Sequence, residues 1–255
     1  MWCLCFMNFM SHSIHIPRQQ RLIRRPSFDP QTQPVVSTVE LLPALLPATI
    51  QLEFIRSAFE HPVDWQVEPI FTESFGGDFS EFDDVIQAAV LVPRVQRPAG
   101  LNVIFTRRAS HLHDHAGQIS FPGGRIEAFD HDAIAAAVRE THEEIGIEPQ
   151  YLKIIGTQPG FLTSTRFAML PVIGQVLPGF TISPDITEVA EVFEVPLSVL
   201  MDPGLHRLHE AQLPEGGHRF YFSITWGPYF IWGATAALIR NLYHYLAAVQ
   251  GSPAA

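Results

Sequence analysis

The chain contains few cysteines, and this shortage limits the class of protein that it can be. Only Cys3 and Cys5 occur among its 255 residues. Two residues this close in sequence are poorly placed for a structural disulfide with each other, and two thiols alone do not complete a tetrahedral zinc site. The cysteine content therefore argues against a disulfide-stabilised secreted domain and favours a protein of the reducing cytoplasm.

Charged residues are also scarce, and positive charge is the scarcer sign. Asp, Glu, Lys and Arg make up 16% of the chain and hydrophobic residues 47%, which is typical of a folded globular protein. Sixteen Lys and Arg residues oppose 26 Asp and Glu residues, giving a net charge of −10. This balance argues against nonspecific binding of nucleic acid. An anionic substrate would need a metal ion or a few well-placed arginines.

The apolar stretch at the N-terminus, residues 1–10, is too short to cross a bilayer, which takes about 20 residues. Its neighbouring arginines follow the apolar run, whereas a secretory signal has its basic residues first. Residues 31–47 are rich in proline and threonine. We therefore expect residues 1–47 to be a poorly ordered extension and linker, and residues 48–250 to form one domain that does not enter a membrane. No internal repeat divides that domain.

The hydrophobic pattern predicts a domain of mixed helices and strands. A short amphipathic helix is expected over residues 52–59, and a longer one over residues 231–246, where apolar residues recur at helical spacing. Residues 64–81 lack a clear period and are expected to form a loop with at most one strand. Residues 193–197 should lead into a short helix that ends near Met201. Apolar or alternating runs predict strands at residues 88–93, 101–107, 118–121, 152–157, 168–176 and 219–225.

The most informative segment is residues 139–146, with the sequence Arg-Glu-Thr-His-Glu-Glu-Ile-Gly. At about 100° per residue, Glu140, Glu143 and Glu144 fall on one side of a helix and the apolar residues fall on the other. Like charges at this spacing destabilise a helix, and a divalent cation would reverse the penalty. Mg²⁺ and Mn²⁺ take carboxylate and phosphate oxygens as ligands. A solvated surface helix is the alternative interpretation of the three glutamates alone.

The residues that flank this segment favour the metal site. Asp130 or Asp132 is expected to cap the start of the helix, and Gly146 its end. Upstream, Gly123 and Gly124 form a turn in which the backbone can approach a ligand closely. A strand, a glycine turn and an acidic helix in this order would hold a metal ion and a diphosphate together.

These residues resemble a known family. Gly124, Asp130 and residues 139–147 are similar to the Nudix box, G-x5-E-x7-R-E-U-x-E-E-x-G-U, where U is aliphatic. Asp130 stands where the box has Glu, and the spacing from Asp130 to Arg139 is one residue longer than in the standard box. The coenzyme A pyrophosphatase branch of the family carries the same extra residue.

A second stretch, residues 104–124, is similar to the signature of that branch, L-L-T-x-R-[SA]-x3-R-x3-G-x3-F-P-G-G. Arg108 matches the first arginine of the signature, whereas His113 stands where the signature has its second arginine. The resemblance covers about residues 86–246 and includes residues 230–236. It implies an α/β fold of the Nudix type, an α/β/α sandwich with a mixed β-sheet.

The resemblance also implies an activity. The expected enzyme is a Mg²⁺- or Mn²⁺-dependent pyrophosphatase that converts coenzyme A or acyl-CoA to 3′,5′-ADP and (acyl-)4′-phosphopantetheine. ADP-ribose or another nucleoside diphosphate derivative is the alternative substrate, and a catalytically silent nucleotide sensor is the alternative class. The partner is expected to be a small nucleoside diphosphate derivative and not nucleic acid, and a homodimer is one expected assembly.

Each candidate residue has an expected role. Glu140, Glu143 and Glu144 are the candidate metal ligands, and Arg139 is expected to hold Glu143 in place. The catalytic set comprises Glu140, Glu143, Arg139, Glu188 and Glu191, because the general base lies either on the helix or on a later loop. The substrate-binding set comprises Arg107, Arg108, His113, Gly123 and Gly124.

Two further groups have alternative interpretations. The alternating residues His111, His113 and His115 would share one face of a strand and could bind zinc, although the glutamates already offer a site for a hard metal. Trp226, Tyr229 and Trp232 either stack on an adenine or belong to the hydrophobic core.

Overall fold

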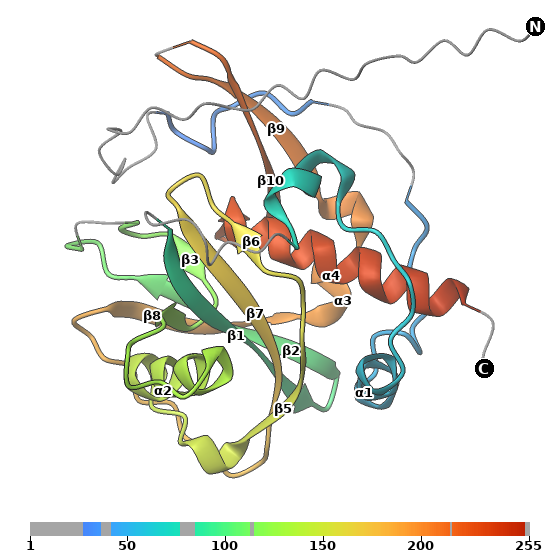
Figure 1. Ribbon diagram of the computed structural model, residues 1–255, viewed down its shortest axis with the longest axis vertical. Coiled ribbons are helices and arrows are strands. Elements are labelled where there is room, and N and C mark those ends of the chain that lie inside the picture. The colour runs from blue at the N-terminus through green and yellow to red at the C-terminus, as the bar shows by residue number, and fades with distance from the viewer. Residues whose placement is uncertain (1–27, 37–41, 77–84, 113–114, 215, 253–255) are drawn as a thin grey trace, which may run out of the picture.

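A mixed sheet of eight strands forms the centre of the fold in the computed structural model (Figure 1). The structure describes residues 28–36, 42–76, 85–112, 115–214 and 216–252. The strands of this sheet are β1 (Ile86–Arg97), β2 (Gly100–Arg108), β3 (Ile119–Ser120), β4 (Gly123–Arg125), β5 (Leu152–Thr157), β6 (Phe161–Leu162), β7 (Phe167–Val176) and β8 (Val189–Pro196).

Strand β1 organises the sheet. It runs parallel to β7, from the pair Ile86–Phe167 to the pair Val95–Val176. Its other edge pairs antiparallel with β4 near its start and with β2 near its end. The remaining pairings are also antiparallel. The sheet is therefore mixed, as predicted. The strands predicted at residues 88–93 and 101–107 do form an antiparallel pair, but the register differs from the expected one. The hairpin joins residues 94–97 to residues 100–103, whereas residues 88–90 pair with β4.

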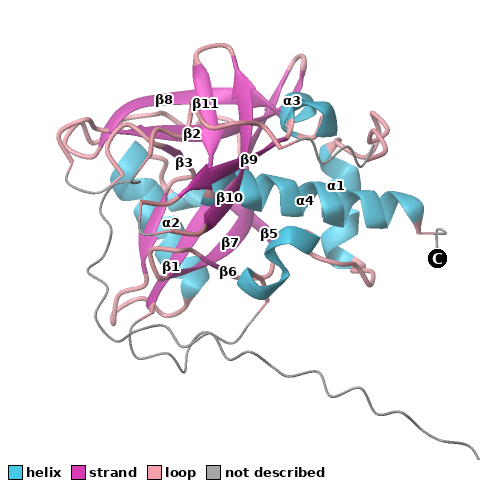
Figure 2. Ribbon diagram, turned by 90° about the horizontal axis from the view of Figure 1, so that it is seen from above, coloured by secondary structure: helices cyan, strands magenta, loops and turns pink. Residues whose placement is uncertain are grey.

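Helices cover both faces of the sheet, which confirms the predicted α/β/α layers. Helix α2 (Ala133–Ile145) lies on one face. The other face carries α1 (Leu52–Glu60), α3 (Leu197–Leu200) and α4 (Ala234–Gly251), and α1 contacts α4. A three-stranded antiparallel sheet, β9 (Arg207–Gln212), β10 (His218–Trp226) and β11 (Tyr229–Trp232), packs beside α4 (Figure 2). Three short 3₁₀ helices complete the description: Pro69–Ser74, Pro149–Tyr151 and Pro203–Leu205.

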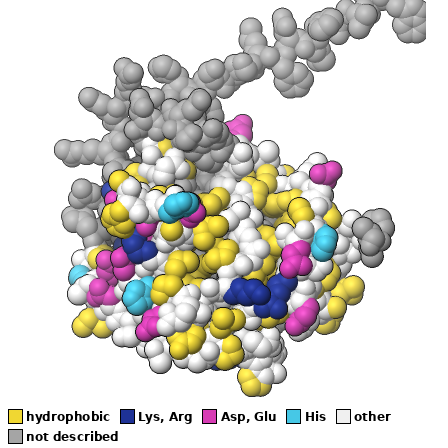
Figure 3. Space-filling view, turned by 60° about the horizontal axis from the view of Figure 1, so that its bottom comes forward, with side chains coloured by type: hydrophobic (Ala, Val, Ile, Leu, Met, Phe, Trp, Pro, Cys, Tyr) yellow, Lys and Arg dark blue, Asp and Glu magenta, His cyan; other side chains and the backbone are white. Residues whose placement is uncertain are grey.

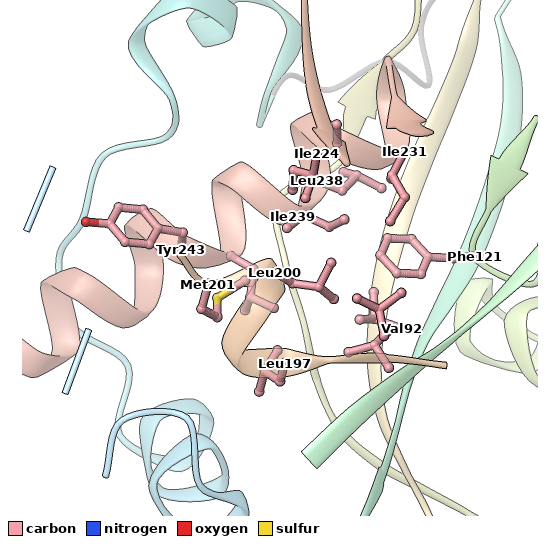
Figure 4. Close-up of a cluster of buried hydrophobic side chains, with 14 of the residues drawn as sticks. Val92, Phe121, Leu197, Leu200, Met201, Ile224, Ile231, Leu238, Ile239 and Tyr243 are labelled. Carbon is pink, nitrogen blue, oxygen red and sulfur yellow. The ribbon is translucent and has the colours of Figure 1, made fainter. Parts of the chain in front are cut away.

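Alternating side chains of β1 separate two cores. Ala89 and Leu91 pack under α2 with Ala136 and Ala137. Side chains of opposite parity along a strand point to the opposite face, and Val92 accordingly joins the large cluster under α4. Figure 4 shows this cluster between α3, α4 and the two sheets; its labelled residues are Val92, Phe121, Leu197, Leu200, Met201, Ile224, Ile231, Leu238, Ile239 and Tyr243.

Two predicted elements differ from the structure. The helix expected from residue 231 begins at Ala234, because Ile231 and Trp232 pair with β10 and form the end of β11. Residues 64–81 contain the 3₁₀ helix Pro69–Ser74 and an isolated bridge between Phe75 and Phe161 in the part that the structure describes. Pairing with β10 decided the first of these outcomes, and periodicity does not report such pairing.

Residues before position 48 contact the domain. Val35 forms a bridge with His209, the Tyr221 hydroxyl donates to the Pro30 carbonyl at 2.6 Å, and Phe28 stacks on Tyr221. The division of the chain at residue 47 stays a prediction, and Cys3 and Cys5 lie outside the described residues.

The surface agrees with the low charge of the chain. On the face shown in Figure 3, Lys and Arg side chains form small groups with acidic side chains beside them, not a broad basic patch. Among the described residues, no helix is both long and apolar enough to cross a bilayer.

A buried ion network fastens the segment before β1 to α4. The Glu68 side chain is 4% exposed and accepts hydrogen bonds from Arg240 Nε and His244 Nε2, both at 2.7 Å. Burial alone would raise the pKa of Glu68, but the hydrogen bonds from His244 and Arg240 prevail and lower it to about 2. The Glu68 backbone N–H also donates to Asn241 Oδ1 at 3.2 Å.

This network predicts a loss of stability in acid. Because the pKa of Glu68 is lowered on folding, its contribution is complete above its ordinary value of 4.5 and is lost as the pH falls toward 2. We expect Glu68→Gln to reduce the free energy of unfolding at pH 7 by on the order of 3 kcal/mol, and to flatten its decline below pH 4.5. Chemical denaturation at several pH values measures this, with exposed Glu60→Gln as the control. Parallel curves for Glu68→Gln and wild type would contradict the assignment.

Candidate active site

Helix α2 begins and ends as the sequence predicts. Of the two candidate caps, Asp132 is the N-cap, and its side chain accepts a hydrogen bond from Ala135 N at 2.8 Å. Gly146 ends the helix with φ of 72°, a left-handed conformation that glycine adopts without strain. These two residues fix the position of the three glutamates on the helix.

Glu144 is the most deeply placed of the three. The residue is 4% exposed, although the helical projection placed it on the side opposite the apolar residues. Its Oε2 accepts a hydrogen bond from Gly123 N at 3.2 Å, and its Oε1 lies 3.9 Å from Arg108 Nη1. Burial raises the pKa of Glu144 to about 8, and the charges of Glu140 and Glu188 act in the same direction. The Glu144 carboxylate is thus desolvated and only weakly neutralised.

Glu140 lies against the glycine turn one helical turn before Glu144. A Cβ atom on Gly124 would be 2.5 Å from the Glu140 Cδ and Oε1 atoms, so only glycine leaves room for this carboxylate. Burial raises the pKa of Glu140 above its usual range, while its hydrogen bond with Arg139, at 2.9 Å, opposes the shift. Glu140 and Glu144 therefore converge on Gly123 and Gly124, which the sequence predicted in a turn but which form the start of strand β4.

Arg139 connects four acceptors around this pair. It binds Asp130 through two hydrogen bonds of 2.9 Å, and its Nη1 donates to Glu140 at 2.9 Å and to Glu143 at 2.8 Å. Its Nη2 also donates to the Arg125 carbonyl at 3.1 Å. The expected contact between Arg139 and Glu143 is present, but the Glu143 side chain is 56% exposed, farther into solvent than Glu140.

Asp130 is a site residue that the sequence analysis placed in the Nudix box and considered as a helix cap, but to which it gave no role in the site. Its side chain is 3% exposed, and its hydrogen bonds with Arg139 lower its pKa. The signal was present, because Asp130 occupies the acidic position of the Nudix box. A carboxylate held in this way fixes the Arg139 guanidinium, which in turn orients the glutamates.

Arg107 and Arg108 are neighbours in sequence but contact different groups. Arg108 lies near Glu144, whereas Arg107 Nη2 lies 3.3 Å from Glu191 Oε2 and its guanidinium sits 5.3 Å from the centre of the Tyr229 ring. Successive side chains of β2 point to opposite faces of the sheet, and the register of β2 against β8 shifts between Arg107 and Arg108. Together these features separate the two guanidinium groups.

Glu188 and Glu191 are likewise separated. Glu188 is exposed and lies in the loop directly before β8. Its charge is close enough to Glu140 and Glu144 to raise the pKa of both. Glu191 instead accepts a hydrogen bond from the Tyr229 hydroxyl at 2.7 Å, beside Arg107. The structure therefore brings Glu188, and not Glu191, to the glutamate pair.

The histidines and aromatic residues with alternative interpretations lie in different surroundings. His113 lies outside the described residues, His111 is exposed, and His115 Nδ1 is 3.0 Å from Gln118 Oε1. The Tyr229 ring stacks on Phe193, with ring centres 3.7 Å apart, and on Trp226 at 5.9 Å. Tyr229 and Trp226 are partly buried against the large core, which favours packing over adenine binding.

The chemistry of Glu140 and Glu144 fits a hard divalent cation. Both carboxylates are desolvated, and Arg108 approaches Glu144 only to 3.9 Å. Across the described parts of the chain, no three His, Cys, Asp or Glu side chains are grouped closely enough to hold a metal by themselves. Mg²⁺ characteristically binds through one or two carboxylates together with water and substrate phosphates, so a pair of glutamates is sufficient protein ligation.

Comparison with known proteins identifies the class. The model of the NUDIX domain matches residues 85–214, which contain the glycine turn, α2 and the loop with Glu188. The chain belongs to the Nudix family.

Its relatives are named as hydrolases of the same family. A protein of Enterobacter sp. (strain 638), "Uncharacterized Nudix hydrolase NudL", is 42% identical over 157 residues, which is 61% of this chain and 80% of the relative. The protein of that name from Salmonella paratyphi B is 40% identical over 156 residues, with the same coverage. Among solved structures, a Nudix hydrolase from M. smegmatis, RenU, has a TM-score of 0.39 and 24% identity over 46% of this chain and 74% of that one. The family and these relatives make the chain a Nudix pyrophosphatase that acts on nucleoside diphosphate derivatives.

Proposed function

We propose that this enzyme hydrolyses the diphosphate of coenzyme A or acyl-CoA in the cytoplasm, with Mg²⁺ or Mn²⁺, to 3′,5′-ADP and (acyl-)4′-phosphopantetheine. The observation that carries the proposal is the convergence of Glu140 and Glu144 on Gly123 and Gly124, with Arg108 beside them. Arg108 and the two glycines belong to the stretch that resembles the coenzyme A branch. That stretch supports the choice of substrate, and the glutamates support the reaction.

The residues of the site have separate roles in binding the metal and the substrate. Glu140 and Glu144 would hold the metal, and Arg139 would keep Glu140 and Glu143 oriented through its own bonds to Asp130. A bound divalent ion supplies charge neutralisation of the diphosphate and makes water more acidic. Arg108 adds positive charge next to Glu144, where a phosphate oxygen would approach. Arg107, which is paired with Glu191, is left for a more distant part of the substrate.

Hydrolysis needs a base for the attacking water. The water oxygen forms a bond to one phosphorus, and the bond from that phosphorus to the bridging oxygen breaks. The bridging oxygen leaves with the other phosphate, and the carboxylate of Glu188 takes the proton from the water. Glu188 suits this role because it is exposed and lies close to the Glu140–Glu144 pair.

The two loop glutamates should therefore respond differently to substitution. We expect Glu188→Gln to lower kcat by roughly 10²–10⁴-fold with little change in Mg²⁺ affinity. Glu191→Gln should mainly alter KM, because Glu191 contacts Arg107 and Tyr229. Steady-state kinetics with Mg²⁺ titrations measure both. A larger kcat loss in Glu191→Gln than in Glu188→Gln would reverse the assignment of the base.

A substrate panel tests the proposed function. The purified enzyme with Mg²⁺ or Mn²⁺ is assayed against coenzyme A, acetyl-CoA, ADP-ribose and diadenosine polyphosphates, with product analysis by chromatography. The highest kcat/KM is expected for coenzyme A or its acyl ester. Preference for ADP-ribose would overturn the choice of substrate, and turnover of none would favour a nucleotide-sensing module.

A further inference from the structure

Strand β1 carries a buried arginine whose charge has no partner among the residues that the structure describes. Arg94 is 0% exposed, and its one hydrogen bond runs from Nε to the Gly174 carbonyl at 3.5 Å. Its Nη1 and Nη2 atoms are buried without an acceptor. Burial, followed by the charge of Arg56, lowers the pKa of Arg94 to about 9. The guanidinium is therefore still charged at neutral pH, and a buried charge without a counterion is strongly unfavourable.

A second arginine lies next to Arg94. Arg56 on α1 donates from Nη2 to Gln175 Oε1, and its buried Nε has no hydrogen-bond acceptor in the described part of the chain. Gln175 is itself the register partner of Arg94 across β1 and β7. No carboxylate of the described residues lies within ion-pair distance of Arg94 or Arg56. Two guanidinium groups and one amide thus meet between α1 and the sheet with an excess of positive charge.

A groove opens beside this arginine pair. It has a volume of about 890 Å³ and is lined by the start of α1, the end of β1 and the segment that follows β7. Gln175 lines the groove and also contacts Arg56. Leu52, another lining residue, lies one helical turn before Arg56 and so beside it on α1. The charged side chains of the groove are Glu53, which is exposed, and Arg97, which is paired with Glu194.

This location is separate from the glutamate site. Gly123 and Gly124 pair with Val90 and Ala89, and α2 packs on the face that carries Ala89 and Leu91. Arg94 lies about four residues farther along β1, roughly 13 Å at the rise of a strand, and its parity with Val90 and Val92 places its side chain on the opposite face.

We propose that the inner end of this groove is a second binding site, which takes a phosphate group between Arg94 and Arg56. Two guanidinium groups match the two negative charges of a phosphate, and each can bind it through two parallel hydrogen bonds. Neither Arg94 nor Arg56 lines the groove, and Gln175 is the lining residue that contacts Arg56, so the Gln175 side chain would turn to admit the ligand. The source of the phosphate is inorganic phosphate or the phosphomonoester of a small metabolite.

Ligand-dependent stability of the full chain tests this site. Metal-free protein is heated in sodium phosphate, in ribose 5-phosphate and in sodium chloride of equal ionic strength. A ligand that binds only the folded state raises Tm in a saturable manner. We expect such a rise of several degrees for wild type with one or both phosphate probes, and calorimetric titration should give one site per chain; the tighter probe identifies the source.

Three variants separate the sites. Arg94→Met should unfold at a higher temperature than wild type without phosphate, because it removes an uncompensated charge, and should lose at least tenfold in phosphate affinity. Arg56→Met tests the second guanidinium at a less buried position if Arg94→Met does not fold. Arg108→Gln should keep the response, because it alters only the glutamate site. No saturable rise in wild type, an equal rise in Arg94→Met and Arg56→Met, or its loss in Arg108→Gln would each overturn the proposal.

Discussion

Replacing Glu144 by glutamine is expected to reduce kcat/KM by on the order of 10³-fold or more and to weaken Mg²⁺ binding, while the fold is retained. The Glu144 carboxylate is 4% exposed and lies against Gly123 N, so the amide of glutamine fits the same space and only the charge is lost. Since a neutral amide is a poor ligand for Mg²⁺, the loss should fall on metal binding and turnover together. Kinetics over a range of Mg²⁺ concentrations measure both.

Glu143→Gln is the matched control on the same helix. Glu143 is 56% exposed, and its side chain is bonded to Arg139. We expect a smaller loss than in Glu144→Gln, because Arg139 still holds Glu140 and Asp130. If Glu143→Gln were the more damaging change, the metal would be bound at the exposed Glu143 and not between the buried Glu140 and Glu144.

The pH dependence of stability shows whether Glu144→Gln acts by charge alone. The pKa of Glu144 is raised on folding from 4.5 to about 8, so the folded protein holds a proton that the unfolded chain releases. In metal-free buffer the free energy of unfolding of wild type should therefore fall as the pH rises from 4.5 to 8. Glu144→Gln should lack this decline and be the more stable protein at pH 8. Identical pH profiles would mean that the carboxylate is not buried in solution.

The local sequence was sufficient to predict helix α2 and its caps. Asp132, Gly146 and the spacing of the glutamates act within a few residues of one another, and the structure confirms the helix from Ala133 to Ile145. The burial of Glu144 could not be predicted in this way. A helical projection gives the direction of a side chain, whereas the group that covers Glu144 is the backbone of Gly123 on another element.

Long-range contacts also decided the features that the sequence left open. Arg107 and Arg108 were both predicted to bind substrate, but a register shift between β2 and β8 directs them to Glu191 and Glu144 respectively. Arg94 stands just past the apolar run 88–93, yet it is fully buried, and its neighbour Arg56 comes from α1, which is distant in sequence. Such effects depend on which strands become neighbours, which periodicity along one segment does not specify.

Gly124→Ala should damage the site with little effect on the fold. The added Cβ would lie 2.5 Å from the Glu140 carboxylate, so the carboxylate must move, whereas the backbone of Gly124 has no left-handed φ to strain. A displacement of about 1 Å in a reacting group can cost roughly 10²-fold in rate. We expect kcat/KM to fall by about this factor, with Tm within a few degrees of wild type.

Substitutions at two other glycines make the test of Gly124 specific. Gly160→Ala is the control, because its Cβ would meet only the Met169 carbonyl at 3.8 Å. Gly123→Ala should instead lower Tm, because its Cβ would lie 2.3 Å from the Ala89 carbonyl and its φ is +153°.

A compensating change then addresses Glu140 itself. Aspartate is shorter by one methylene group, so Glu140→Asp withdraws the carboxylate from the alanine side chain at position 124. The double variant Gly124→Ala/Glu140→Asp should recover part of the Mg²⁺ affinity that Gly124→Ala loses, although Glu140→Asp alone is harmful. The size of this recovery gives the coupling energy between position 124 and position 140, as expected for two residues in contact. Wild-type kcat/KM in Gly124→Ala, or strictly additive losses in the double variant, would show that Glu140 does not act from its place against the glycine turn.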